Sequence, residues 1–184
     1  SRLVLSCEQP AEWSMRIRHP WWATAGLEIR VNGQLQTAAS QPGSYAVVTR
    51  TWNEGDTVDL AFPFTLRTEG FRDNPRRFAF LHGPLVLCAQ VEAGQPQPAV
   101  VAEPDQVLAS LKPVADKPST FAGSADVFRV AGRQDGSAVT LEPFYKMHGP
   151  RHYVVYWDAF TPAEWQAREA EYRAEMARQQ ALQA

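Results

Sequence analysis

The chain has 184 residues, of which 45% are hydrophobic and 21% are charged, and these proportions are typical of a globular protein with a substantial core. Its 18 Lys and Arg against 20 Asp and Glu give a formal charge of −2, which leaves no excess of cations for a polyanionic partner. No apolar run approaches the length of about 18 residues that spans a bilayer, and the first residues lack the pattern of a signal peptide. We therefore expect no nucleic-acid and no membrane partner, and we expect the chain to be a segment of a longer protein whose compartment these residues leave open.

Alternating apolar and polar residues predict β-strands through the first 93 residues. Leu27, Ile29 and Val31 alternate with charged residues, and the Asn32-Gly33 pair that follows is typical of a two-residue hairpin turn. Further strand patterns, each bounded by turn residues, lie at 3–7, 13–18, 45–52, 58–64 and 85–89. Short strands at this spacing predict an antiparallel β-sandwich over residues 1–93.

The composition changes over residues 94–123, where prolines interrupt the strand patterns. Only Val107–Leu111 has a pattern compatible with a helical turn. We interpret 94–123 as a proline-rich connector that crosses the surface.

Residues 124–184 predict a small β unit followed by a helix. Strand patterns recur at 127–130, 139–144 and 153–157, and so short a unit needs a larger one to pack on. The sequence Thr161-Pro162-Ala163-Glu164 is a capping box with proline at the first helical position. Trp165, Tyr172 and Met176 then share one face. The predicted fold class is all-β: an antiparallel β-sandwich, a smaller packed β unit and one C-terminal α-helix.

The sequence contains no recognisable catalytic or metal-binding pattern. Glu54, Asp56 and Asp59 are the densest acidic group, but they surround a tight turn, where such side chains bind the backbone. His148 and His152 are four residues apart, yet Gly149 and Pro150 between them oppose the helix that such a ligand pair needs. We therefore predict no catalytic residue, no metal and no cofactor.

The two cysteines, Cys7 and Cys88, lie 81 positions apart in apolar strand-like segments. They are too few for a disulfide scaffold and too isolated for a zinc site. We interpret both as buried thiols.

Aromatic residues are the remaining functional candidates, because the C–H faces of sugar rings stack on indole and phenol rings. Two aromatic pairs bracket the turn at His148, and a third follows Pro20 at the end of a strand. Core filling and contact with another domain are the alternatives. The candidates for carbohydrate or interdomain contact are Trp21, Trp22, Tyr145, His148 and Trp157.

Several segments, taken in order, resemble one known arrangement. They are Met15–Ala23, Val31–Gly33, Thr49–Asp56, His82–Leu87, Leu141–His148 and Tyr153–Asp158. This series resembles the C-terminal region that follows the catalytic barrel in glycoside hydrolase family 127 (GH127), the β-L-arabinofuranosidase type. One departure is Arg18-His19-Pro20, where the family more usually has Arg-Ile-Pro.

The resemblance implies a parent protein with an (α/α)₆ barrel, a glutamate acid/base and a zinc-bound cysteine nucleophile. None of those positions is matched here, because neither Cys7 nor Cys88 lies in a paired-cysteine motif. We therefore expect a non-catalytic accessory region of a bacterial glycoside hydrolase, whose partner is the N-terminal catalytic barrel of the same polypeptide. We also expect self-association of the chain. The alternative is a carbohydrate-binding module that presents Trp22, Tyr145 or Trp157 to a plant-type polysaccharide or oligosaccharide.

Overall fold

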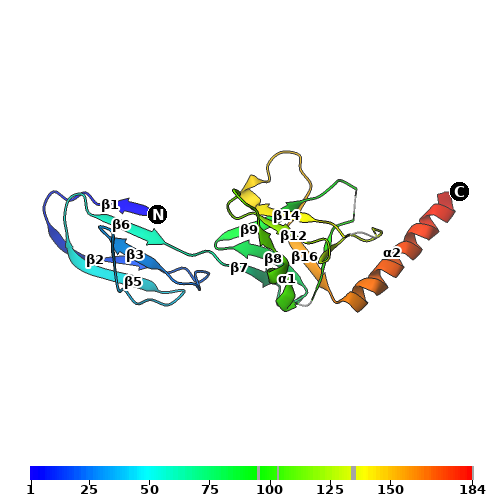
Figure 1. Ribbon diagram of the computed structural model, residues 1–184, viewed down its shortest axis with the longest axis horizontal. Helices are drawn as coiled ribbons and strands as arrows, with labels where there is room; N and C mark the ends of the chain where they lie inside the picture. Colours follow the sequence, from blue (N-terminus) through cyan, green and yellow to red (C-terminus); the bar gives the residue numbers. More distant parts are fainter. Residues whose placement is uncertain (95, 103, 134–135, 184) are drawn as a thin grey trace. The chain divides into compact units, whose positions relative to one another are not determined.

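The computed structural model describes residues 1–94, 96–102, 104–133 and 136–183. The chain forms two compact units, Ser1–Thr65 and Leu66–Ala184, both built mainly from antiparallel strands (Figure 1). The predicted all-β class with a C-terminal helix is confirmed. Among the described residues, no helix is both long enough and apolar enough to cross a membrane.

The first unit is a β-sandwich of two sheets. One sheet has the antiparallel order β1 (Arg2–Val4), β6 (Thr57–Ala61), β3 (Glu28–Val31) and β4 (Gln34–Leu35). The other pairs β2 (Ala11–Arg18) with β5 (Tyr45–Trp52) over eight residues each. Apolar side chains from both sheets meet in one core: Ile17, Ile29, Val31, Ala46, Val48, Trp52 and Val58.

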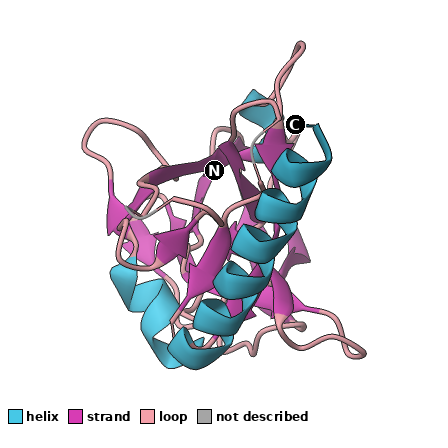
Figure 2. Cartoon of the chain, turned by 90° about the vertical axis from the view of Figure 1, so that its right-hand side faces the viewer, coloured by secondary structure: helices cyan, strands magenta, loops and turns pink. Residues whose placement is uncertain are grey.

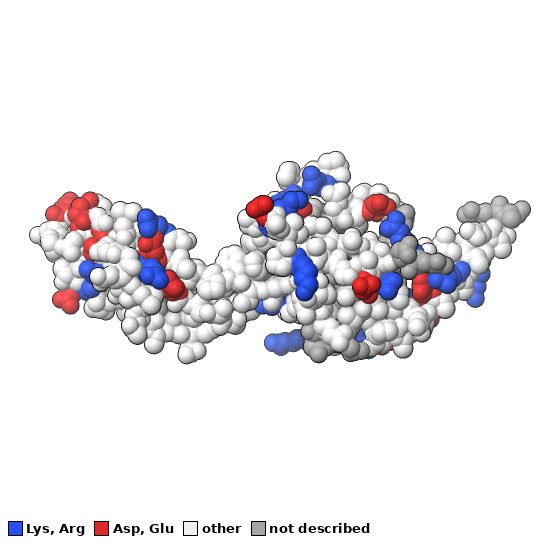
Figure 3. All heavy atoms as spheres, viewed as in Figure 1, with Lys and Arg blue, Asp and Glu red and all other residues white. Residues whose placement is uncertain are grey.

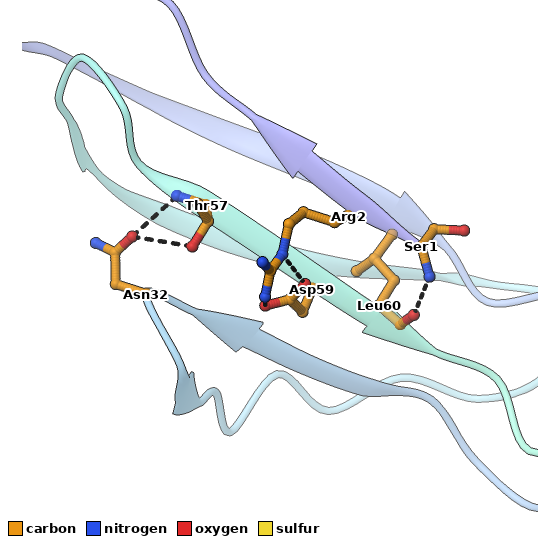
Figure 4. Close-up of polar contacts among 6 residues, drawn as sticks. All are labelled: Ser1, Arg2, Asn32, Thr57, Asp59 and Leu60. Carbon is orange, nitrogen blue, oxygen red and sulfur yellow. Dashed lines mark hydrogen bonds and ion pairs between the residues drawn. The ribbon is translucent and has the colours of Figure 1, made fainter.

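The Asn32-Gly33 turn joins β3 to β4 as the sequence predicts. Both residues have positive φ, +50° and +80°, which is the geometry of the tight hairpin. The Asn32 side chain also links neighbouring strands, because its Oδ1 accepts a hydrogen bond from the Thr57 backbone N–H at 2.9 Å (Figure 4). Its amide Nδ2 donates to Asp56 at 2.8 Å.

The edge strand β1 is held to β6 by polar contacts along its length. Arg2 and Asp59 are direct partners in the strand register and form a two-point ion pair, 2.7 Å from Nε to Oδ1 and 3.0 Å from Nη2 to Oδ2 (Figure 4). The Ser1 nitrogen donates to the Leu60 carbonyl at 2.8 Å. These contacts give a three-residue strand a defined register on the sheet.

The second unit is built on one ten-stranded sheet. Its main path runs through β11 (Lys112–Pro113), β12 (Phe121–Gly123), β14 (Val139–Pro143), β9 (Leu85–Gln90), β8 (Arg77–His82), β16 (Tyr156–Phe160), β10 (Ala99–Val101) and β13 (Phe128–Arg129). Two further strands lie off this path: β15 (Tyr153–Val154) pairs with β9, and β7 (Leu66–Gly70) pairs with β8. The sheet is mixed, because β10 and β16 run parallel.

Three rings form the centre of the second core. Trp157 packs against Phe128 with ring centroids 5.1 Å apart and against Phe80 at 6.0 Å, and all three side chains are fully buried. Leu87 and Leu141 from the central strands complete this centre. Short helices α1 (Pro104–Ser110) and η1 (Phe144–Lys146) lie between strands.

The unit boundary differs from the predicted one. Residues 66–93 were predicted to complete the first sandwich, but they belong to the second unit because β8 pairs with β16 and β9 pairs with β14. The predicted connector 94–123 contributes β10, β11, β12 and α1 to that same unit. The second unit is therefore the larger one, and long-range strand pairing decides where it begins.

The C-terminal helix α2 (Pro162–Gln183) begins at the predicted capping box. Figure 2 shows it as the long helix that leads to the C-terminus. The Glu164 carboxylate accepts from the Thr161 N–H and hydroxyl, both at 2.9 Å, while the Glu164 N–H donates back to Thr161 Oγ1 at 3.3 Å. The Arg76 guanidinium and these Thr161 donors lower the pKa of Glu164 to about 2. The start of α2 is thus fixed by ionised and hydrogen-bonded groups.

Candidate functional site

The strongest cluster of candidate residues lies in the first unit, where β2 ends and the chain turns through Pro20 to Ala23. A buried histidine holds this turn. His19 Nε2 lies 2.9 Å from the Ala23 carbonyl oxygen, and its Nδ1 lies 2.8 Å from Ser40 Oγ. Because a carbonyl oxygen can only accept, Nε2 carries a proton and donates. The turn is also closed by a bond from the Ala23 N–H to the Pro20 carbonyl at 3.1 Å.

This turn presents the two predicted tryptophans differently. Trp22 is half-buried and meets Phe64 edge-on, with centroids 5.3 Å apart and ring planes at 89°, and it lies 6.1 Å from Phe62. Trp21 is 54% exposed, and Phe64 is 41% exposed. We call Trp21, Trp22, Phe62 and Phe64 the aromatic turn cluster. Its exposed rings suit contact with either a sugar or a protein surface.

A second group lies in the second unit after β14. Tyr145 in η1 is 68% exposed, and His148 is exposed in the loop that follows. Phe144 is anchored by an edge-on contact with Tyr153 at 5.5 Å. No helix brings His148 and His152 onto one face, and the described residues contain no group of three or more His, Cys, Asp or Glu that could hold a metal.

Trp157 is not a surface residue, so its assignment as a contact candidate is corrected. Its side chain is fully buried on β16, and its Nε1 has no hydrogen-bond partner among the described protein atoms. Strand alternation instead turns Tyr156 outward, where it is 50% exposed and lies 5.3 Å from the Phe71 ring. The sequence shows that one member of each aromatic pair faces inward, but which one depends on the pairing with β8.

The acidic turn of the first unit has a structural role. Hydrogen bonds from the Asn32 amide and the Asn53 N–H hold the pKa of Asp56 below its usual range. Glu54 accepts hydrogen bonds from Ser6 and from the Cys7 N–H, and Asp59 is paired with Arg2. Each of the three carboxylates therefore stabilises local backbone or a strand contact.

Both cysteines are free thiols. Cys88 is fully buried on β9, and burial, followed by the nearby Glu142 carboxylate, raises its pKa to about 11. A thiol in this state is protonated at neutral pH and is a poor nucleophile. Cys7 is half-buried against the core of the first sandwich.

A groove of about 790 Å³ in the second unit runs between α2, β16 and the segment before β10. Arg77 and Asp158 pair within it, with Nε to Oδ1 at 2.8 Å and Nη2 to Oδ2 at 2.9 Å. Those hydrogen bonds hold the pKa of Asp158 below its usual range. Arg168 lies over the Phe160 ring, 5.4 Å from its centroid. Arg77 and Asp158 thus neutralise each other, while Glu171, Glu175 and Arg178 of α2 also line the groove.

Basic and acidic side chains are interspersed on each unit over the face shown in Figure 3. Such a mixture does not create the one-signed field that attracts a polyanion.

Residues 1–64 match the family model described as "Beta-L-arabinofuranosidase, GH127 middle domain". This match ends one residue before the boundary between the two units. The chain is therefore GH127-like, and its first unit is similar in sequence to the GH127 middle domain.

Solved structures show the same fold over most of the chain. A glycoside hydrolase matches with a TM-score of 0.63 and 22% identity, over 86% of this chain and 30% of its own. A GH127 β-L-arabinofuranosidase from Geobacillus stearothermophilus T6 matches with a TM-score of 0.59 and 22% identity, over 86% of this chain and 28% of its own. A further GH127 β-arabinofuranosidase matches with a TM-score of 0.54 and 19% identity, over 88% of this chain and 31% of its own. The chain thus spans less than a third of the length of these proteins, and the comparison with curated proteins gave no match.

Proposed function

We propose that this chain is a non-catalytic accessory region of a bacterial glycoside hydrolase, and that it supports a catalytic barrel formed by another part of the same polypeptide. The observation that carries this proposal is the middle-domain match over residues 1–64. The fold likeness over less than a third of the matched hydrolases is consistent with it, because most of each of those proteins lies outside the shared region.

The described side chains also support a non-catalytic role. Hydrolysis of a glycoside needs a pair of carboxylates, or a nucleophile with an acid/base, facing one substrate. Asp59 and Asp158 are instead paired with arginines, and Asp56 binds backbone and amide donors. The buried Cys88 is held protonated.

The proposal is tested by assaying the purified chain on 4-nitrophenyl glycosides, including the β-L-arabinofuranoside. We expect no release of nitrophenol above that of the heat-unfolded chain, with an intact GH127 β-L-arabinofuranosidase as the positive control. Turnover that stays with the chain through a second purification, and that Asp158→Asn abolishes, would overturn the proposal.

A second candidate function is carbohydrate binding. The observation that favours it is the exposure of Trp21, at 54%, on a turn held by the buried His19, together with Tyr145 at 68%. Fixed aromatic rings at the surface lose little freedom on binding, which suits stacking on a sugar ring.

Affinity electrophoresis on arabinan, xylan and pectin gels tests this second function. Binding predicts retarded migration that Trp21→Ala or Tyr145→Ala relieves, while Phe71→Ala serves as a matched loss of an exposed ring elsewhere. Unchanged mobility of the native chain on all three polymers rejects binding to them.

A further inference from the structure

The helix α2 uses one face to dock on its own unit. Trp165 is buried and lies 5.8 Å from the Phe160 ring. Tyr172, seven residues on, packs so closely on the 130–133 loop that a Cβ added at Gly132 would lie 2.6 Å from its ring. Residues seven apart lie on the same face of a helix. The docked face is therefore defined by Trp165 and Tyr172.

The opposite face of α2 is uncovered. Figure 2 looks onto the helix, and no described element of the second unit lies in front of it. Beyond Tyr172, the described side chains of residues 173–182 are all exposed, including Leu182 at 87%. The second half of this helix is therefore exposed, with Ala174, Glu175 and Arg178 at the edge of the groove.

The sequence of the uncovered face has the period of a coiled coil. Alanines recur at alternating intervals of four and three residues, the 3.5-residue repeat of paired helices. On a helical wheel these a and d positions lie directly across from Trp165 and Tyr172. The alanines concerned are Ala163, Ala167, Ala170, Ala174, Ala177 and Ala181, and all are exposed.

The charges beside this face are complementary between two copies of α2 only when the two helices are antiparallel. Glu171 and Arg178 both occupy the e position, seven residues apart, on the side of α2 that lines the groove beside β16. In an antiparallel pair, where e faces e, Glu171 of each copy lies beside Arg178 of the other, which gives two ion pairs by symmetry. In a parallel pair, Arg173 at g would lie beside Arg178 of the second copy, and like charges oppose that arrangement.

We propose that α2 binds a second copy of this chain as an antiparallel two-helix coiled coil, with the Glu171–Arg178 pairs flanking its alanine face. The small side chains let the helix axes approach to about 8 Å. The layers then place Ala170 opposite Ala181 and Ala174 opposite Ala177 of the second copy. This proposal concerns assembly and goes beyond the proposed accessory function.

The contact is small, so the dimer is weak and reversible, with a dissociation constant of about 100 µM. Sedimentation velocity of the whole chain from about 5 µM to about 1 mM spans that value. We expect the weight-average mass to rise from monomer toward dimer over this range. A monomer at every concentration overturns the proposal.

Substitutions on α2 identify the contacting face. Ala174→Glu places a charge in the alanine face and should abolish the dimer, whereas Ala109→Glu makes the same change at an exposed position of α1 and should not alter it. Glu171→Arg and Arg178→Glu should each weaken the dimer at least fivefold, and the double exchange should restore it. Arg151→Glu is the control for an exposed charge reversal away from α2. If the α2 substitutions leave the dissociation constant of the dimer unchanged, the dimer forms through another surface, and the proposal is contradicted.

Disulfide trapping determines the orientation. Chains with Cys7→Ser and either Ala170→Cys or Ala181→Cys are prepared, one of them labelled with nitrogen-15, while the buried Cys88 remains. The antiparallel pair predicts a mixed disulfide between the two chains. It predicts none within either preparation alone, because the two 170 positions would lie about 16 Å apart along the axis. Disulfides between identical chains would show a parallel pair and reject the antiparallel assignment.

Discussion

Arg77 on β8 and Asp158 on β16 lie directly opposite each other in an antiparallel strand pair and form a two-point ion pair at 2.8 and 2.9 Å. The pair joins residues 81 positions apart in the chain, at the side of the sheet that faces α2. An exposed ion pair with this two-point geometry contributes to stability, because the strand register holds both charges in place.

Asp158→Asn should lower the melting temperature at pH 7 by about 1–3 °C, since the pair is partly exposed and screened by solvent. The pKa of Asp158 is lower in the folded chain than in the unfolded chain. Its stabilising contribution is therefore present above the unfolded pKa of about 4 and is lost as the pH falls through the lower folded pKa. Thermal unfolding of both chains from pH 7 to pH 2 should show their difference shrink in the acid range.

Glu164, Asp56 and Asp59 also have lowered pKa values, but they titrate alike in both chains and cancel in the difference. A difference that stays constant down to pH 2 would show that the lost stability does not come from the charge on Asp158.

Replacement of Trp157 should test the core of the second unit. Trp157→Ala should reduce the free energy of unfolding by about 3–5 kcal/mol, because it removes a fully buried ring from contact with Phe80 and Phe128. Trp157→Phe should cost less, about 2 kcal/mol, since it also removes the buried Nε1–H that lacks a protein partner. Urea unfolding measures both, and Trp21→Ala is the control at an exposed tryptophan. Equal losses for Trp157→Phe and Trp157→Ala would contradict this reading of the indole.

Replacement of His19 should test what holds the aromatic turn cluster. His19→Ala removes both ring hydrogen bonds and leaves the Ala23 carbonyl with the Gly26 N–H as its remaining donor, so we expect a loss of about 2 kcal/mol in the free energy of unfolding. Ser40→Ala removes only the Nδ1 partner and should cost about 1 kcal/mol.

Tryptophan fluorescence gives a second readout of the same turn, because Trp21 and Trp22 are two of the six tryptophans in the chain. In His19→Ala the emission of these indoles should shift to the red and become easier to quench with iodide, while Ser40→Ala should change it little. Unchanged quenching in His19→Ala would show that the turn does not depend on His19.

Local patterns were sufficient to predict most strands of the first unit and the start of α2. Alternating residues over 45–52 predict a strand, and the Asn32-Gly33 pair predicts a hairpin turn. Strand β5 and the β3–β4 hairpin lie at these positions. The capping box likewise depends only on residues within one helical turn. Such features need no knowledge of the partner strand.

Features decided by distant pairing could not be predicted in the same way. Leu87 on β9 lies opposite Pro143 on β14, and nothing within either segment specifies that partner. The pattern of apolar and polar residues therefore predicted neither the unit boundary at Thr65 nor the strands within the proline-rich segment. The same dependence on pairing turned Trp157 inward and Tyr156 outward.

The proposed absence of catalysis is tested most directly by intact-mass measurement after incubation with an electrophilic β-L-arabinofuranosyl analogue that traps glycosidase nucleophiles. We predict no adduct on the folded chain, since the Cys88 thiol is buried with its pKa raised to about 11 and Asp158 is paired with Arg77. After unfolding, a general thiol reagent should reach both cysteines, which checks that they are intact. A stoichiometric sugar adduct on Cys88 or on a carboxylate of the folded chain would contradict the account.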